Sequence, residues 1–288
     1  MNRPDLPPRP RLLSPEKISA RDYELIRSII HTTSRVNLGE NKTELVCARI
    51  RKRLRATGIP SIRQYCSLIR QGLLEDEIPH LIDVTTTNHT FFFREPEHFD
   101  FLREHILPEF RKAQVTDPGL ELRLWSAACS SGEEPYSLAI TLAECLGLSP
   151  KIPWRIFASD ISSVMVETAR MATYRAERMT SIGMALRKKY FIQDNDSCTV
   201  IEALRRRVLI RQLNLLEDPA PAPHPFDVIF CRNVMIYFDR PTQQQLLERL
   251  SASLRPGGYL IVGHAEGLSG IRKHLTLVKP SILRNQNL

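Results

Sequence analysis

Two adjacent glutamates follow a loop of small residues. Residues 126–132 read SAACSSG and lead into Glu133, Glu134 and Pro135, and a proline here is typical of the first turn of a helix. Small residues allow the backbone to approach a ligand closely. Carboxylates at a helix N-terminus repel phosphate and favour a cationic ligand, such as the ammonium and sulfonium groups of S-adenosylmethionine. Taken alone, the pair fits a simple capped helix start better, and only the neighbouring loops favour a ligand site.

Two further loops carry groups suited to other parts of such a ligand. Asp160 ends an apolar run and could accept hydrogen bonds from both hydroxyls of a ribose. Alternatively, it caps a helix that begins near Ser162. Asn214 ends another apolar run, and its amide could read an adenine between Leu215 and Leu216. Alternatively, this is a polar turn before two core leucines.

The apolar run 226–230 is followed by residues 231–238, which read CRNVMIYF. This loop brings a cation, an amide and a phenol together as Arg232, Asn233 and Tyr237. Such a set after a buried strand favours a functional site, although a structural tyrosine is the alternative.

A polar linker before these loops contains three successive phenylalanines, 91–93. We expect the phenylalanines to pack against a folded domain, so that Asn88, Thr90 and Arg94 face a cleft. The alternative is a hydrophobic hinge in which Arg94 pairs with a neighbouring glutamate.

Other chemistry has weaker support in the sequence. His264 and Glu266 could form an acid/base pair, although both also fit a solvated strand end. No metal site is expected, because the cysteines lack metal-like spacing; they are Cys47, Cys66, Cys129, Cys145, Cys198 and Cys231. The absence of a signal peptide pattern and of a long apolar run predicts a cytoplasmic protein without direct membrane insertion.

Short apolar runs and amphipathic segments alternate from residue 120 onward. The runs expected to form strands are 122–127, 155–158, 208–213, 227–230 and 259–262. The segments expected to form helices are 135–146, 162–173, 181–190 and 241–254. This alternation predicts an α/β domain with a mostly parallel sheet, which binds ligands at the carboxyl ends of its strands.

The N-terminal part differs in texture and in charge. Residues 1–14 are rich in proline and arginine and predict a disordered leader, and the helices expected after it are 22–32, 43–57, 61–71 and 73–85. Residues 1–72 hold 15 Lys and Arg against 6 Asp and Glu, whereas the whole chain has a net charge of +8. A local excess of positive charge predicts a docking surface for an acidic partner.

Together these motifs resemble the chemotaxis receptor methyltransferase family, often called CheR, over nearly the whole chain. The matching segments are 86–94, 125–128, 132–137, 158–161, 214–216 and 229–238. The resemblance implies a Rossmann-like, S-adenosylmethionine-dependent methyltransferase domain with a small β-subdomain, preceded by an all-α domain. The corresponding parts are a leader (1–14), a helical receptor-docking domain (15–85), a linker that contributes to the site (86–119), and a methyltransferase domain (120–288) with an insert at about 192–210.

The resemblance also implies the reaction and the residues that perform it. A protein-glutamate O-methyltransferase of this kind transfers a methyl group from S-adenosylmethionine to receptor glutamates, which gives methyl esters and S-adenosylhomocysteine. Arg94 and Tyr237 are similar to the residues nearest the transferred methyl. The implied cofactor contacts are Asn88, Thr90, Arg94, Glu134, Asp160, Asn214, Leu215, Arg232 and Asn233.

The resemblance implies that the basic helices dock on the cytoplasmic part of a chemoreceptor, through Arg49, Arg51, Lys52, Arg53 and Arg55. Docking on a receptor's C-terminal tail peptide is not expected, because residues 192–210 contain no glycine. Two alternatives are a nucleic-acid methyltransferase and a non-catalytic regulator that binds S-adenosylmethionine. The first is disfavoured because aromatic residues that could stack on bases are scarce among the basic ones.

Overall fold

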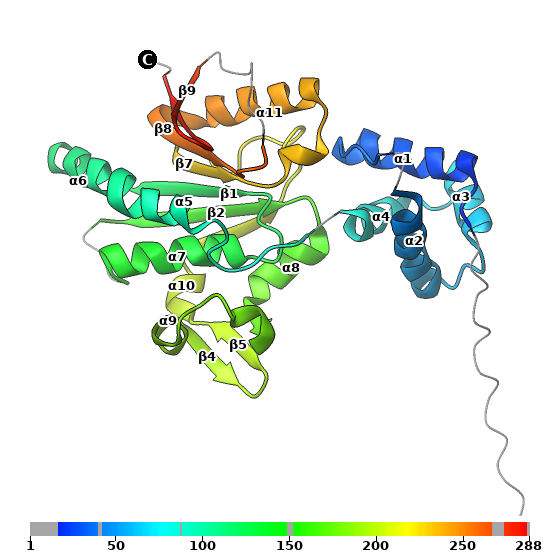
Figure 1. Cartoon of the computed structure of the whole chain (residues 1–288), viewed down its shortest axis with the longest axis horizontal. Helices are drawn as coiled ribbons and strands as arrows, with labels where there is room; N and C mark the ends of the chain where they lie inside the picture. The colour runs from blue at the N-terminus through cyan, green and yellow to red at the C-terminus, as the bar shows by residue number, and fades with distance from the viewer. Residues whose placement is uncertain (1–16, 40–41, 87, 149–151, 267–273, 287–288) are drawn as a thin grey trace, which may run out of the picture. The chain divides into compact units, whose positions relative to one another are not determined.

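The chain forms two compact units, one of residues 1–33 and 38–85 and the other of residues 34–37 and 86–288 (Figure 1). The structure is a computed structural model, which describes residues 17–39, 42–86, 88–148, 152–266 and 274–286. The predicted leader, 1–14, lies outside these residues. Among the described residues, no helix combines the length and the apolar character needed to cross a membrane.

The first unit is helical. Its elements are α1 (Ala20–Ser34), α2 (Thr43–Thr57), α3 (Ile62–Arg70), the 3-10 turn η2 (Glu75–Glu77) and α4 (Ile78–Thr85). Apolar residues three or four positions apart turn one face of each helix to a common core, whose members include Ile26, Ile30, Ile50, Leu54, Tyr65 and Leu81. The predicted helix 43–57 coincides with α2, which ends where Gly58 adopts a left-handed φ of 74°. The predicted helix 73–85 is divided into η2 and α4.

Two of the arginines expected on the receptor-docking surface hold this unit together. Arg53 donates to both carboxylate oxygens of Glu77, at 2.6 and 2.9 Å, and the Tyr65 hydroxyl donates to Glu77 Oε1 at 3.0 Å. Glu77 is buried, so its charge depends on these partners. Arg49 donates to the carbonyl of Val84. These two guanidinium groups therefore have structural roles.

A seven-stranded sheet forms the centre of the second unit, in the order β6-β2-β1-β7-β8-β10-β9. The strands are β1 (Leu122–Ala127), β2 (Trp154–Asp160), β6 (Val208–Gln212), β7 (Phe226–Cys231), β8 (Leu254–Val262), β9 (Leu275–Lys279) and β10 (Ile282–Asn285). The first five strands in the sheet order are parallel, and β10 and β9 are antiparallel. The predicted α/β class with a mostly parallel sheet is confirmed, and each of the five predicted strands overlaps one of the parallel strands.

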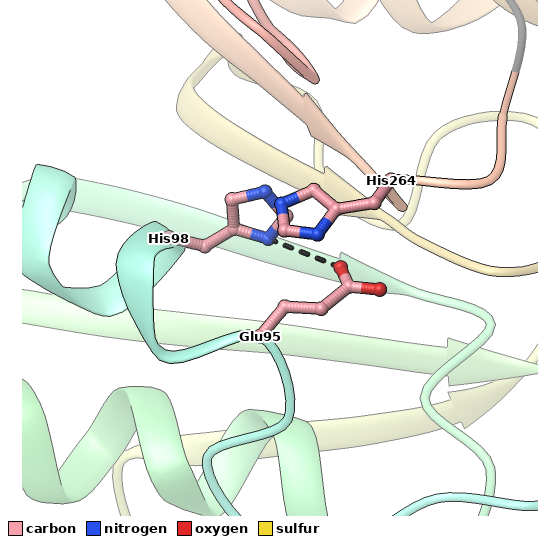
Figure 2. A group of neighbouring side chains, drawn as sticks. All are labelled: Glu95, His98 and His264. Atoms are coloured by element: carbon pink, nitrogen blue, oxygen red, sulfur yellow. Dashed lines mark ion pairs between the residues drawn. The ribbon is translucent and has the colours of Figure 1, made fainter.

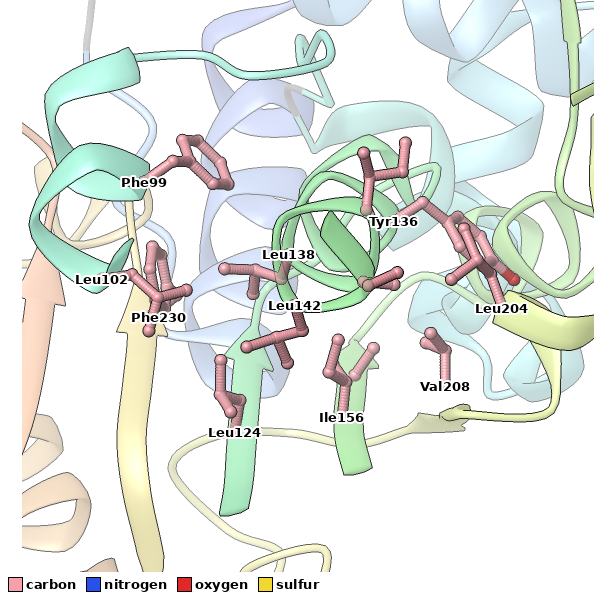
Figure 3. Packing of buried hydrophobic residues seen from close by; sticks show 14 of the residues in the cluster. Phe99, Leu102, Leu124, Tyr136, Leu138, Leu142, Ile156, Leu204, Val208 and Phe230 are labelled. Carbon is pink, nitrogen blue, oxygen red and sulfur yellow. The ribbon is translucent and has the colours of Figure 1, made fainter. Parts of the chain in front are cut away.

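Apolar side chains cover both faces of the parallel strands. On one face, Leu138 and Leu142 of α7 (Glu133–Leu146) lie over Leu124 of β1 and Ile156 of β2 (Figure 3). The core of the other face includes three leucines of α11 (Arg240–Ser253), which are Leu246, Leu247 and Leu250. Burial on both faces explains why these strands read as continuous apolar runs in the sequence.

The predicted linker, 86–119, contains regular structure. It forms α5 (Pro96–Phe101), the π-helical turn η3 (Leu102–Ile106) and α6 (Leu107–Thr116). These elements pack into the same core as α7, through Phe99, Phe101, Leu102, Ile106, Leu107 and Phe110. The π-helical turn precedes Pro108, which has no N–H to continue the α-helical bonding.

A small antiparallel sheet, β3-β5-β4, forms the subdomain. Its strands are β3 (Thr173–Arg175), β4 (Phe191–Asp194) and β5 (Ser197–Val200), and between and beside them lie α8 (Ser163–Met171), η4 (Ala176–Met179), α9 (Met184–Tyr190) and α10 (Glu202–Arg205). The expected insert, 192–210, therefore differs from the structure at both ends. Strand β3 is too short to show an alternating pattern, and β6 pairs in parallel with β2, which makes it part of the main sheet.

Candidate active site

Four neighbouring strands, β6, β2, β1 and β7, end at the same edge of the sheet. The segments that end or follow them carry Asn214, Asp160, Glu134 and Arg232 respectively. The strand order reverses direction between β1 and β7, and such a reversal opens a ligand-binding crevice at the carboxyl edge of a parallel sheet. The topology thus brings the ends of the candidate loops to one edge.

Arg232 lies at this reversal, with only 2% of its side chain exposed. Its Nη1 donates to Glu134 Oε2 at 3.0 Å, and its Nη2 donates to Glu95 Oε2 at 2.9 Å and to the carbonyl of Arg94. A buried cation is stable only when it is paired and hydrogen-bonded. One side chain therefore joins the loop after β7, the loop after β1 and the segment before α5.

The charges around Arg232 are mutually dependent. Burial acts to raise the pKa of Glu95, but the hydrogen bonds and the charge of Arg232 outweigh it and hold that pKa below its ordinary value. Burial raises the pKa of Glu134, against the opposing effects of Arg232 and of a hydrogen bond from Ser126 Oγ at 2.6 Å. Burial, together with the charge of Arg232, lowers the pKa of His98 to about 3, so its ring is neutral near pH 7.

Glu133 and Glu134, which follow the loop after β1 (the first loop), bind different partners. Glu133 is fully buried, accepts a hydrogen bond from Ser131 Oγ at 2.7 Å and pairs with Arg178 at 2.9 Å. Tyr174 of the small sheet donates to the Ser131 carbonyl at 2.9 Å. The subdomain is thereby attached to the first loop, and Glu134 is the glutamate that faces Arg232.

Asp160 supports the same loop from β2. Its Oδ2 accepts from Ser130 N at 2.8 Å, and its Oδ1 accepts from Ser162 N at 3.0 Å. The cap of α8 is Ser162 itself, whose hydroxyl accepts from Met165 N. Of the two alternatives for Asp160, a simple helix cap is therefore wrong. Each carboxylate oxygen carries two lone pairs and can accept more than one hydrogen bond.

Asn214 forms a local turn. Its Oδ1 accepts from Leu216 N at 3.1 Å, and its backbone N–H donates to Asp218 at 2.6 Å. Leu216 is buried in the core, whereas Leu215 is half-buried and packs against that core. Of the two leucines expected beside an adenine, Leu216 is therefore a core residue.

The loop after β7 is anchored by Glu266. Glu266 Oε1 accepts from Val234 N at 2.9 Å and Met235 N at 2.8 Å, and its other oxygen accepts from Gly263 N. Both expectations for Glu266, an acid/base partner of His264 and a solvated strand end, are wrong, because it is buried and bound to backbone N–H groups.

Strained backbone concentrates in these loops. Among the described residues, nine that are not glycine have a positive φ, and five of these lie in the segments around Arg232. The five are Phe93, Glu95, Ala128, Ser130 and Asn233. Such conformations cost of order 1 kcal/mol each and are retained where the surrounding structure fixes a functional geometry.

The linker residues lie at different depths. Phe92 is fully buried and makes an edge contact with Tyr174, with ring centroids 4.9 Å apart, and Phe93 packs against the same core. The expected packing on a domain is therefore present for these two phenylalanines, whereas Phe91 is exposed. Arg94 has a carbonyl that binds Arg232, but its guanidinium donates to the His89 carbonyl at 3.0 Å and lies 5.9 Å from the ring of Phe91. The Arg94 guanidinium therefore contacts His89 and Phe91 in place of the neighbouring glutamate expected in the alternative of a hydrophobic hinge.

The remaining candidates also occupy defined positions. The Asn88 carbonyl accepts from Ser130 Oγ at 3.0 Å, and the Thr90 carbonyl accepts from Arg178 at 3.3 Å. Tyr237 is half-buried at the end of the 3-10 turn η5 (Met235–Tyr237). The linker thus meets the first loop and the subdomain beside the strand ends.

Two glutamates have structural partners that the sequence did not indicate: Glu95 binds Arg232, and Glu266 binds the loop after β7. Its position suggests Glu95 as the neighbouring glutamate that could pair with Arg94, whereas its partner Arg232 is 137 residues away. No local spacing links such residues. A signal for Glu266 was available in its position three residues after a glycine at a strand end, but that pattern is common.

Both units match the models of known protein families. Residues 21–86 match the CheR methyltransferase, all-alpha domain, and residues 88–282 match the CheR methyltransferase, SAM binding domain. A chemotaxis protein methyltransferase of Borreliella burgdorferi is 36% identical over 92% of this chain and 94% of its own length. One of Salmonella typhimurium is 38% identical over 90% and 88%, and chemotaxis protein methyltransferase 2 of Pseudomonas aeruginosa is 39% identical over 85% and 86%.

The position of Gly263 yields a test of the anchored loop. A Cβ on Gly263 would collide with the side chain of Asn233 and lie 3.0 Å from its backbone nitrogen. Gly263→Ala should therefore lower the free energy of unfolding by roughly 1–3 kcal/mol, measured by urea unfolding. Gly183→Ala is the matched control, because a Cβ on Gly183 meets nothing within 4 Å. Equal stability of the two variants would contradict the close approach.

Proposed function

The chain belongs to the CheR methyltransferase family, and we propose that it transfers a methyl group from S-adenosylmethionine to glutamate side chains on chemotaxis receptors. The products are glutamate methyl esters and S-adenosylhomocysteine. The matched SAM-binding domain and the relatives named as chemotaxis protein methyltransferases support this proposal.

The observation that carries the proposal is the buried Arg232 between Glu95 and Glu134, at the point where the strand order reverses. The carboxylates of Glu134 and Asp160 at this sheet edge suit S-adenosylmethionine. Glu134 can accept from the ammonium group, and Asp160 can accept from the ribose hydroxyls. The proposed cofactor contacts are Asn88, Thr90, Arg94, Glu134, Asp160, Asn214, Leu215, Arg232 and Asn233.

The acceptor chemistry requires little of the protein beyond positioning. A glutamate carboxylate is already ionised near neutral pH, because its reference pKa is about 4.3, so methyl transfer to it needs no general base. The cofactor, when bound, supplies an electrophilic methyl group. The protein has to exclude water and align the acceptor oxygen with that methyl group.

Arg94 and Tyr237 are proposed to act at the transferred methyl group. The guanidinium of Arg94 lies near Phe91 and His89, where it could orient an incoming carboxylate. Tyr237 follows the anchored loop after β7 and carries a hydroxyl suited to positioning the methyl group.

We further propose that α2 docks on an acidic surface of the receptor. Arg49 and Arg53 are engaged within the helical unit, whereas Lys52 and Arg55 are exposed. Arg51 is half-buried, so the proposed docking charges are narrowed to the two exposed residues, Lys52 and Arg55. Use of a receptor tail peptide is not proposed, because the β4–β5 turn at residues 195–196 and the rest of 192–210 contain no glycine.

A labelling experiment tests the reaction itself. The purified chain is incubated with methyl-labelled S-adenosylmethionine and, separately, with a receptor cytoplasmic fragment and with nucleic acid. We expect label on the receptor fragment that mild base releases as methanol, as for a carboxyl methyl ester. Label on nucleic acid would support a nucleic-acid methyltransferase instead. Cofactor binding without transfer to either acceptor would support a non-catalytic regulator.

Tyr237→Phe tests the role at the methyl group. Loss of one positioned hydroxyl should reduce kcat at least about tenfold, while the Kd for S-adenosylmethionine stays within about twofold. Tyr259→Phe is the control, because the Tyr259 hydroxyl bonds to Glu109 and has no proposed catalytic role. An unchanged kcat in Tyr237→Phe would exclude the proposed role.

Reversal of the exposed charges tests the docking proposal. Lys52→Glu combined with Arg55→Glu should raise KM for the receptor fragment severalfold and leave cofactor affinity unchanged, because like charges then oppose an acidic partner. The same two-charge change at exposed Lys112 and Lys188 serves as the control. Equal KM values for the two double variants would argue against docking through α2.

A further inference from the structure

Three side chains that can ligate a metal ion converge beside Arg232, in the second unit. They are Glu95, just before α5, His98 within α5, and His264 after β8 (Figure 2). One ligand atom of each lies within 4.8 Å of those of the other two. The two imidazole rings meet edge to face, with centroids 4.9 Å apart. His98 is buried, whereas 44% of the His264 side chain is exposed.

The hydroxyl of Ser281 lies beside the ring of His98 and can hold it in a ligating orientation. Ser281 Oγ donates its proton to the carbonyl of Pro280 and lies 2.7 Å from His98 Nε2. When that proton is given to the Pro280 carbonyl, the Ser281 oxygen accepts from His98 Nε2–H. The neutral ring then carries a lone pair on Nδ1. Metal-ligating histidines are oriented in this way, with one ring nitrogen bonded to an oxygen and the other directed at the ion.

The lone pair of His98 Nδ1 faces another acceptor. Glu95 Oε2 lies 3.4 Å away, and Nδ1 is buried without a hydrogen-bond partner among the described residues. In the tautomer with a bare Nδ1, an acceptor faces a carboxylate in a buried place, which is unfavourable unless a metal cation lies between them. With bonds of about 2.1 Å and tetrahedral angles, two ligands of Zn²⁺ are separated by roughly 3.4 Å.

We propose that Glu95, His98 and His264 form a binding site for one divalent transition-metal ion of the Zn²⁺ class. Two imidazole nitrogens and one carboxylate oxygen are a donor set that this class prefers, whereas Mg²⁺ prefers oxygen ligands alone. The exposed His264 closes the site by a side-chain rotation, and the fourth position is open to water or to Glu97, whose Oε1 lies 3.8 Å from His264 Nε2.

The charge balance permits a cation despite the nearby guanidinium. Arg232 carries one positive charge and pairs with two carboxylates, those of Glu95 and Glu134. One negative charge is therefore left over when both carboxylates are ionised. Because Glu95 serves both Arg232 and the proposed ion, the metal site borders the cofactor site directly.

Calorimetric titration of the chelator-treated whole chain with ZnCl₂ tests this site. We expect one equivalent of Zn²⁺ to bind, and MgCl₂ at the same concentrations to give no binding. His264→Ala removes an exposed ligand, and it should weaken Zn²⁺ binding by at least about tenfold, since even an outer-shell partner typically contributes that much. His274→Ala is the matched control, because His274 is exposed and lies outside the cluster.

A second variant separates ligation from folding. Ser281→Ala removes only the hydroxyl beside His98 Nε2, and it should weaken Zn²⁺ binding about tenfold or more by releasing the ring. Thermal unfolding without metal verifies that each variant is folded. Absence of stoichiometric Zn²⁺ binding by the unaltered chain, or equal affinity in the unaltered chain and in His264→Ala, would overturn the proposal.

Discussion

The second unit depends on one buried guanidinium. Arg232 takes its two counterions from Glu134, after β1, and Glu95, before α5, so three segments far apart in the chain meet at a single charge. Removing one partner of a buried pair typically costs about 3–5 kcal/mol, because the other charge is left uncompensated. This constraint sets the position of the linker relative to the sheet edge. The helices that follow in the linker pack into the core through their own apolar side chains.

The other contacts at the sheet edge act as supports for that arrangement. Glu266 binds the backbone of the loop after β7, and Asp160 binds the backbone of the loop after β1. Tyr174 ties the small sheet to the same loop. Rigid placement of this kind suits a reaction in which the acceptor is already a nucleophile and alignment is the main requirement. The positive φ values in these loops are maintained by the same contacts.

Much of this organisation could be predicted from the sequence, for identifiable physical reasons. Strands buried on both faces read as apolar runs, so the five parallel strands and the shared edge of their loops were predictable, and α2 was predicted with its observed bounds. The three-residue β3, the four-residue β10 and the mostly exposed edge strand β9 were not, because short or exposed strands lack a distinct pattern. The partners of Arg232 could not be predicted, since pairs separated by 137 and 98 residues are created by the tertiary fold alone. The structural role of Arg53 could not be predicted either, because a basic helix face has the same sequence pattern whether it contacts Glu77 or solvent.

The most direct measurement is a crystal structure of the whole chain with S-adenosylhomocysteine. We expect the amino-acid end of the ligand to contact Glu134 beside an intact Arg232 pair, and Asp160 to accept from the ribose hydroxyls. A ligand bound elsewhere, or bound at this edge without contact to Glu134 and Asp160, would show that these carboxylates do not form the cofactor site.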